Sequence, residues 1–175
     1  MEMAEFQMAF GHFLRSTNEK EVISKKLLDL IRRRSDVSSL QTSGRFLDVG
    51  AASGSLTEPL ARFFYEGIAL EINPDAAKEI QARDLKNVSV VASAIQAFEP
   101  KNQFDLILAS HVLYYLDAEE RSRQVDRMLS WLKPSGRLVL VLNSSSGPAG
   151  SLPHFIEALD GQQTTVSVEN IRGSL

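Results

Sequence analysis

Residues 46–54 read Phe46-Leu47-Asp48-Val49-Gly50-Ala51-Ala52-Ser53-Gly54, a short apolar run that carries one acid and passes into small residues. A continuous apolar run of this length is typical of a strand buried on both faces of a parallel sheet. The small residues that follow predict a tight turn into a helix, with backbone N–H groups facing the carboxyl edge of the sheet. The stretch therefore predicts a binding site of the nucleotide type.

The alternation of strand and helix continues along the chain. Five apolar runs fit buried strands: 45–49, 67–72, 88–92, 104–109 and 137–142. Between them we expect helices that begin near Ser55, at Asn73 with Pro74 in the first turn, and at Asp117. Strands that alternate with helices predict a doubly wound α/β sandwich with a mostly parallel sheet.

The segments outside this pattern carry local signals of their own. Apolar residues at three- and four-residue spacing predict a helix over 18–34. The polar segment 35–44 is expected to be a loop, and Lys133-Pro134-Ser135-Gly136 a turn in which Gly136 admits a positive φ. A short helix is expected around 154–159.

The end of the chain bears on the sheet edge. A last strand at 137–142 would lie at an edge, although its apolar sequence is that of a fully buried strand. Open edges invite pairing with another chain. We therefore expect the domain to be incomplete at its C-terminus, or to be completed by a second copy or another partner.

Composition excludes several classes of function. The chain has 175 residues, a formal net charge of −3, 43% hydrophobic residues and no cysteine. Disulfide scaffolds and thiolate metal sites are therefore excluded, and the spacing of the three histidines predicts no metal site. A balanced surface charge argues against nucleic acid as a partner. With no secretory leader and no apolar run of roughly 18 residues, the sequence predicts a cytoplasmic protein without a membrane contact.

Two acids are expected at the carboxyl edge of the sheet. Asp48 precedes the small-residue turn, where a carboxylate attracts a cationic ligand and repels a pyrophosphate. Glu71 ends the second strand about 20 residues later, the offset at which an acid meets ribose hydroxyls. A dinucleotide fingerprint would require glycine in place of Ala52 and Ser55. Asp48 could instead cap its own loop, and Glu71 could be a solvated strand end.

The combination of 46–54, 71–74, 104–116 and 132–136 resembles the class I S-adenosylmethionine-dependent methyltransferases. The resemblance implies a Rossmann-like sheet in the order 3-2-1-4-5, here with five strands and the C-terminal strands missing. It also implies S-adenosylmethionine as cofactor and S-adenosylhomocysteine as product. It divides the chain into an N-terminal helical lid, 1–44, and a cofactor-binding domain, 45–175.

The resemblance further implies which residues border the cofactor. Asp48 and the turn lie beside the methionine part, and Glu71 holds the ribose. The whole implied set is Asp48, Gly50, Ala51, Ala52, Ser53, Gly54, Glu71, Ile72, Ser93, Ala94 and Ser110. Two positions depart from the family pattern: Ala52 replaces the middle glycine of the turn, and Ser93-Ala94 stands where many members have an acid.

A narrower likeness concerns the methyl acceptor. Residues 10–19, 112–115 and 141–147 resemble stretches of histamine N-methyltransferase and its bacterial relatives. That likeness implies that Glu19 recognises an amine and that His111 faces the substrate. We expect His111 to accept a proton or position the nucleophile, and Tyr114 or Tyr115 to line the pocket over the sulfonium. Core packing of both tyrosines and a structural role for His111 are the alternatives.

Three functions follow from these features. The leading one is methyl transfer from S-adenosylmethionine to a small molecule, in particular an amine, because holding donor and nucleophile in line supplies most of the rate. The second is a non-catalytic or regulatory methyltransferase-like binding module, in which Ala52 and Ser93 mark a weakened cofactor site. The third, a nicotinamide oxidoreductase, is disfavoured by the missing glycines.

Overall fold

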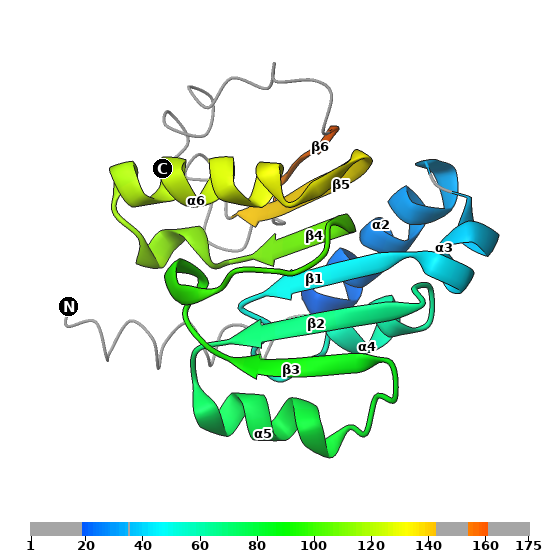
Figure 1. The fold of residues 1–175 in the computed structure, drawn as a ribbon, viewed down its shortest axis with the longest axis horizontal. Coiled ribbons are helices and arrows are strands. Elements are labelled where there is room, and N and C mark those ends of the chain that lie inside the picture. The colour runs from blue at the N-terminus through cyan, green and yellow to red at the C-terminus, as the bar shows by residue number, and fades with distance from the viewer. Residues whose placement is uncertain (1–18, 35, 143–153, 161–175) are drawn as a thin grey trace.

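The computed structural model describes residues 19–34, 36–142 and 154–160, which form one sheet flanked by helices (Figure 1). The helices are α2 (Glu19–Arg34), α3 (Val37–Ser43), α4 (Thr57–Ala61), α5 (Pro74–Ala82) and α6 (Ala118–Ser130), with 3-10 turns η1 (Ile95–Ala97) and η2 (Leu113–Tyr115). The strands are β1 (Arg45–Val49), β2 (Glu66–Glu71), β3 (Val88–Ala92), β4 (Phe104–Ser110), β5 (Leu132–Leu142) and β6 (His154–Asp160).

The sheet has the order β3-β2-β1-β4-β5-β6 (Figure 1). Strands β1 to β5 are all parallel, which confirms the predicted doubly wound arrangement and the order 3-2-1-4-5. In such a sheet the carboxyl ends of β1, β2 and β4 reach the same edge. The fold thus brings the turn after β1, the end of β2 and the segment after β4 together.

The C-terminal edge differs from the prediction. The expected helix around 154–159 is wrong: these residues form β6, which pairs antiparallel with β5 from Leu142↔His154 to Arg137↔Asp160. The expectation of five strands is corrected to six. The physical reason is that the backbone donors and acceptors of a buried strand need partners, which β6 supplies along β5.

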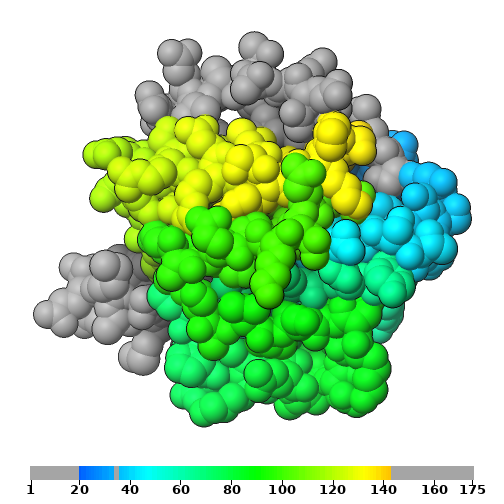
Figure 2. Space-filling model, in the orientation of Figure 1, coloured from blue at the N-terminus to red at the C-terminus, as the bar shows by residue number. Residues whose placement is uncertain are grey.

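Apolar side chains cover both faces of the sheet, as the continuous strand patterns predict. On one face α2, α3 and α4 contribute Ile23, Leu27, Ile31, Leu40 and Leu60 to a cluster that contains Phe46 and Leu108. On the other face α6 contributes Val125 and Met128 to a cluster that contains Leu47, Ile107 and Leu138. In the space-filling view α6 lies in the upper part of the coloured surface, and the α5–β3 region forms the lower part (Figure 2).

Two local predictions are also corrected. Segment 35–44 contains α3 rather than a loop, because the Asp36 side chain accepts a hydrogen bond from Ser38 N at 3.1 Å and caps the helix. Residues 133–136 lie within β5 as an irregularity rather than ahead of it. Gly136 is required there by close approach and not by a positive φ: a Cβ would lie 2.6 Å from the Phe104 carbonyl oxygen.

The predicted helix starts at Asn73 and Asp117 are confirmed. Asn73 caps α5 by accepting from Asp75 N at 2.9 Å, with Pro74 in the first turn, and Asp117 caps α6 by accepting from Glu120 N at 2.8 Å. None of the helices within 19–34 and 36–142 is long and apolar enough to cross a membrane.

Candidate active site

The turn after β1 has a left-handed backbone at three positions. Gly50, Ala52 and Gly54 have φ values of +67°, +48° and +76°. A Cβ at Gly50 would lie 2.4 Å from Val112 Cγ2, so glycine is required both by φ and by close approach. Gly50 N and Ala51 N donate to Leu70 O at 2.8 and 3.1 Å. The turn is thereby fixed against both β2 and the segment that follows β4.

Glu71, at the end of β2, fastens the same turn. Its Oε2 accepts a hydrogen bond from Ala52 N at 2.7 Å, and its Oε1 accepts one from Asn73 N at 2.8 Å. The side chain is buried, with 7% of its surface exposed, so it is not a solvated strand end. An ionised carboxylate accepts about four hydrogen bonds in all, which leaves acceptor capacity on both oxygens for ligand hydroxyls.

Asp48 lies in the protein interior rather than at a solvent-exposed opening beside the turn. It is 2% exposed, and Thr57 Oγ1 donates to its Oδ2 at 2.6 Å. Burial raises the pKa of Asp48 to about 7; the Thr57 hydrogen bond opposes this rise, and the negative charge of Glu71 adds to it. The influence of Glu71 shows that the two acids share one region. A nearby cation would return Asp48 to its charged form.

The segment after β4 places a histidine and two tyrosines at this edge. His111 is buried, and its backbone is left-handed at φ +57°; burial lowers the pKa of its imidazole to about 4. Its ring stacks on Tyr114 with centroids 6.1 Å apart. Tyr115 is 49% exposed, and its pKa is raised by burial and by the negative charge of Glu71. Tyr115 and Glu71 therefore lie at the same edge.

The remaining residues of the implied set are distributed as follows. Ile72, next to Glu71, is 69% exposed, so its apolar side chain is accessible at this edge of the sheet. Ser93 N donates to Glu71 O at 3.1 Å, which places Ser93 and Ala94 beside the end of β2. Ser110 is half-buried at the end of β4. Glu19 begins α2, and its side chain lies outside the described part of the structure.

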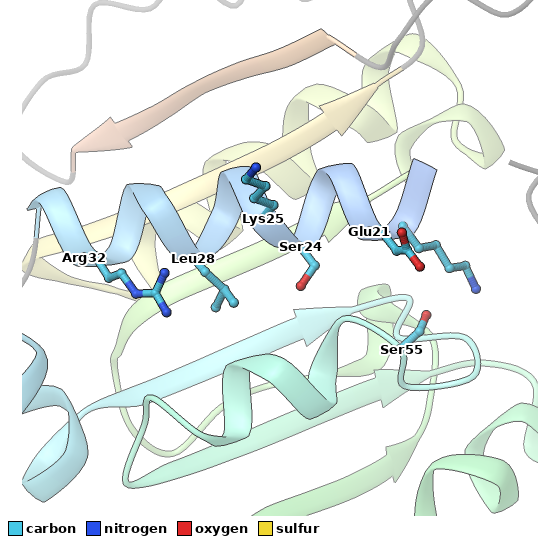
Figure 3. Close-up of a pocket in the computed structure, with 7 residues that line it drawn as sticks. Glu21, Ser24, Lys25, Leu28, Arg32 and Ser55 are labelled. Atoms are coloured by element: carbon cyan, nitrogen blue, oxygen red, sulfur yellow. The ribbon is translucent and has the colours of Figure 1, made fainter. Parts of the chain in front are cut away.

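A hollow of about 480 Å³ runs between α2 and the turn that precedes α4 (Figure 3). Leu28 and Ser24 project from α2 toward this gap, and Ser55 projects toward it from the turn (Figure 3). Glu21 lies at the end nearest the turn (Figure 3), and Lys20 also lines the hollow. The hollow therefore adjoins the turn 50–54 on the side of α2. Its lining carries one carboxylate, two hydroxyls and Leu28 together with three cationic side chains, those of Lys20, Lys25 and Arg32.

Three residues that the sequence analysis did not identify complete the site. Thr57 holds Asp48, Val112 packs against Gly50, and Arg83 donates from Nε to Ser53 O at 2.6 Å. Their spacing in the sequence does not reveal them, because each reaches the turn from a different element of the fold. Within the described ranges no three His, Asp or Glu side chains are grouped as metal ligands would be.

The profile of the methyltransferase domain family matches residues 17–169 of the chain. The chain belongs to the methyltransferase domain family. Among similar proteins, nodulation protein S of Rhizobium tropici is 38% identical to the chain over 96 residues, which cover 53% of this chain and 40% of that protein. Nodulation protein S of Bradyrhizobium diazoefficiens is 33% identical over 117 residues, covering 65% of this chain and 53% of that protein.

A solved methyltransferase has a similar fold. The N-methyltransferase NodS of Bradyrhizobium japonicum WM9, in complex with S-adenosyl-L-homocysteine, matches with a TM-score of 0.66 and 26% identity. The match covers 76% of this chain and 66% of that one. This methyltransferase domain spans about half the length of the nodulation proteins that it matches.

Proposed function

We propose that the chain binds S-adenosylmethionine and transfers its methyl group to a small-molecule acceptor. The observation that carries this proposal is the placement of Glu71, which fastens the small-residue turn through Ala52 N and keeps acceptor capacity at the same edge. The match to the methyltransferase domain supports the reaction class. The cofactor supplies the reactive methyl on a sulfonium, so the protein's contribution is binding and alignment.

The chain's own residues would hold the cofactor in three regions. The turn 50–54 and Asp48 would border the methionine part, Glu71 would accept from the ribose hydroxyls, and Ile72 with Ser93 and Ala94 would flank the adenine. Ser110 would contribute at the end of β4. The left-handed backbone of Ala52 supports this arrangement, because the turn forms although the family's middle glycine is absent.

For the acceptor we propose an amine. Support comes from two acids in the first turn of α2, Glu19 and Glu21, of which Glu21 lines the hollow near Ser55. The three cationic side chains of the same hollow favour the neutral form of the amine over an ammonium. Burial lowers the pKa of His111 to about 4, so its imidazole is neutral and fits a group that orients the free amine, the form whose lone pair attacks the methyl group. Tyr114 and Tyr115 would line the methyl side of the pocket. The name of the NodS N-methyltransferase agrees with nitrogen as the methylated atom. The N-terminal segment 1–44, which contains α2, would then form the lid of the pocket.

Calorimetry tests the cofactor first. Titration of the chain with S-adenosylmethionine and S-adenosylhomocysteine should give saturable binding, whereas NAD should give none. Incubation with a methyl-labelled donor and a panel of primary amines, alcohols and carboxylates should label the amines. Binding without labelling of any acceptor would favour the non-catalytic binding module, and binding of neither sulfur nucleoside would overturn the proposal.

A further inference from the structure

Arg83, the residue that follows α5, reaches across to the turn after β1. Its Nε donates to the Ser53 carbonyl oxygen at 2.6 Å, and its Nη1 donates to Glu58 Oε2 of α4, also at 2.6 Å. Two bonds from one planar guanidinium fix the orientation of the group as well as its position. The side chain is 32% exposed, so the pair is partly protected from solvent.

The turn that Arg83 holds contains a residue in an unfavourable conformation. Ala52 has a φ of +48°, where a Cβ approaches the following carbonyl oxygen. For an alanine this lowers the population of the left-handed state by a factor of about 5 to 30, whereas glycine adopts it freely. Something outside Ala52 must therefore stabilise its conformation.

A backbone hydrogen bond from Gly54 N to Ala51 O, at 2.8 Å, closes the turn around Ala52, and two further bonds hold it on either side. On one side Glu71 Oε2 accepts from Ala52 N at 2.7 Å. On the other side the next carbonyl, that of Ser53, accepts from Arg83. Rotation of Ala52 out of the left-handed region would turn the 51–52 peptide unit against Glu71. The Ser53 carbonyl belongs to the 53–54 unit, so the same rotation would shift it through the intervening 52–53 unit and lengthen its bond to Arg83.

Gly54 allows the guanidinium to approach this closely. A Cβ on Gly54 would lie 3.2 Å from both Cδ and Nε of Arg83. Glu58 in turn restrains the guanidinium from the α4 side, and Arg62 Nη2 donates to the other oxygen of Glu58 at 3.0 Å. Arg83 thus contacts the turn through the Ser53 carbonyl, and Glu71 contacts it through Ala52 N.

We propose that Arg83 is a positioning residue: through the Ser53 carbonyl it holds Ala52 left-handed and so keeps the cofactor turn in its binding conformation. This inference rests on the proposed function for the identity of the cofactor. The tether, by which we mean the hydrogen bond from Arg83 Nε to the Ser53 carbonyl, does not depend on that function. When a binding conformation is only partly populated, the apparent affinity falls by that fraction. Loss of Arg83 therefore weakens binding only as far as Ala52 then leaves the left-handed region.

The test is a double-mutant cycle between Arg83→Ala and Ala52→Gly, with Arg62→Ala as the matched control on Glu58. In the Ala52 chain, Arg83→Ala should raise the Kd for S-adenosylhomocysteine about 5- to 10-fold. In the Ala52→Gly chain the same change should raise it less than about 3-fold, because glycine needs no tether. Arg62→Ala, which leaves the turn untouched, should stay within about 2-fold of the original.

Amide hydrogen exchange of Ala52 and Gly54 in the ligand-free chain gives the second measurement, because their N–H groups donate to Glu71 Oε2 and to Ala51 O. Exchange should accelerate in Arg83→Ala and slow again in Arg83→Lys, whose ammonium can still donate to Ser53 but lacks the fork that also engages Glu58. Equal losses of affinity in both backgrounds, or equal effects of Arg62→Ala and Arg83→Ala, would overturn the inference. If the unmutated chain binds no S-adenosylhomocysteine, the proposed function fails, and the exchange data alone then decide on the tether.

Discussion

Thr57 donates its hydroxyl hydrogen bond to Asp48 Oδ2 across 2.6 Å, between two side chains that are both buried. The bond favours the charged form of the carboxyl, while burial and the negative charge of Glu71 favour the neutral form. The outcome is a pKa of about 7. Asp48 is therefore balanced between its two forms near neutral pH, in the place where a cationic cofactor is proposed to bind.

The first prediction concerns Thr57. Thr57→Val keeps the shape of the side chain but removes its hydroxyl, whose hydrogen bond lowers the pKa of Asp48. Asp48 therefore becomes more fully protonated at pH 7. The free energy of unfolding should fall by about 1–3 kcal/mol, the cost of leaving a buried acceptor without its donor. Urea denaturation at pH 7 measures this change. Thr57→Ser, which keeps the donor, should cost less; equal losses in Val and Ser would contradict the role of the hydroxyl.

The second prediction concerns the pH dependence of stability. The pKa of Asp48 is raised from 3.8 to about 7, so its contribution to stability is present below pH 4 and is lost as the pH rises toward 7. The pKa of His111 is lowered from 6.5 to about 4, so its contribution is present above pH 6.5 and is lost as the pH falls toward 4. Between about pH 4 and 6.5 the two contributions oppose each other.

Single variants should separate these contributions. Asp48→Asn removes the Asp48 contribution and retains that of His111. The free energy of unfolding should therefore rise more steeply with pH between 4.5 and 6.5 than in the unmutated chain. His111→Gln should leave the Asp48 contribution and make the slope more negative. Each change in slope should be at most about 1.4 kcal/mol per pH unit. Urea denaturation at three pH values measures the slopes, and a shift of the same sign in both variants would contradict the assignment.

The third prediction concerns Glu71. Glu71→Gln keeps one acceptor oxygen but places an NH₂ donor opposite either Ala52 N or Asn73 N. Hydrogen bonds to a charged group contribute about 1.5–3 kcal/mol, so the Kd for S-adenosylhomocysteine should rise by about 10-fold or more. Calorimetric titration measures it. Glu66→Gln, at the other end of β2 and paired with Arg45, is the matched control and should leave the Kd unchanged.

The fourth prediction concerns Tyr115. Its exposed ring lies at the edge that carries Glu71, where we propose that it faces the sulfonium. A cation over an aromatic face gains about 0.5–2 kcal/mol, which the uncharged sulfur of S-adenosylhomocysteine does not. Tyr115→Leu should therefore weaken S-adenosylmethionine more than S-adenosylhomocysteine, by about 2- to 30-fold, whereas Tyr115→Phe should preserve the ratio. Parallel titrations of the two ligands give this ratio; an unchanged ratio in Tyr115→Leu would remove the ring from the methyl site.

Most of the fold could be read from the sequence, because buried parallel strands and capped helices leave local signals. The five apolar runs became β1 to β5, and Asn73 and Asp117 begin the helices that their capping side chains predict. The errors lie where the local signal is ambiguous. Segment 154–160 is short and apolar enough for either a helix or a strand, and only the open edge of β5 favours the strand.

The sequence by itself determined that small residues follow β1, that an acid ends β2, and that both reach one edge, because strand order and chain direction are encoded in the alternation of elements. Only the tertiary structure decided the state of these groups. Burial and the Thr57 hydrogen bond set the pKa of Asp48. Glu71 and Arg83 hold Ala52 at a positive φ. The Val112 side chain leaves room only for glycine at position 50. Each of these effects depends on contacts between residues far apart in the chain, which periodicity and spacing do not encode.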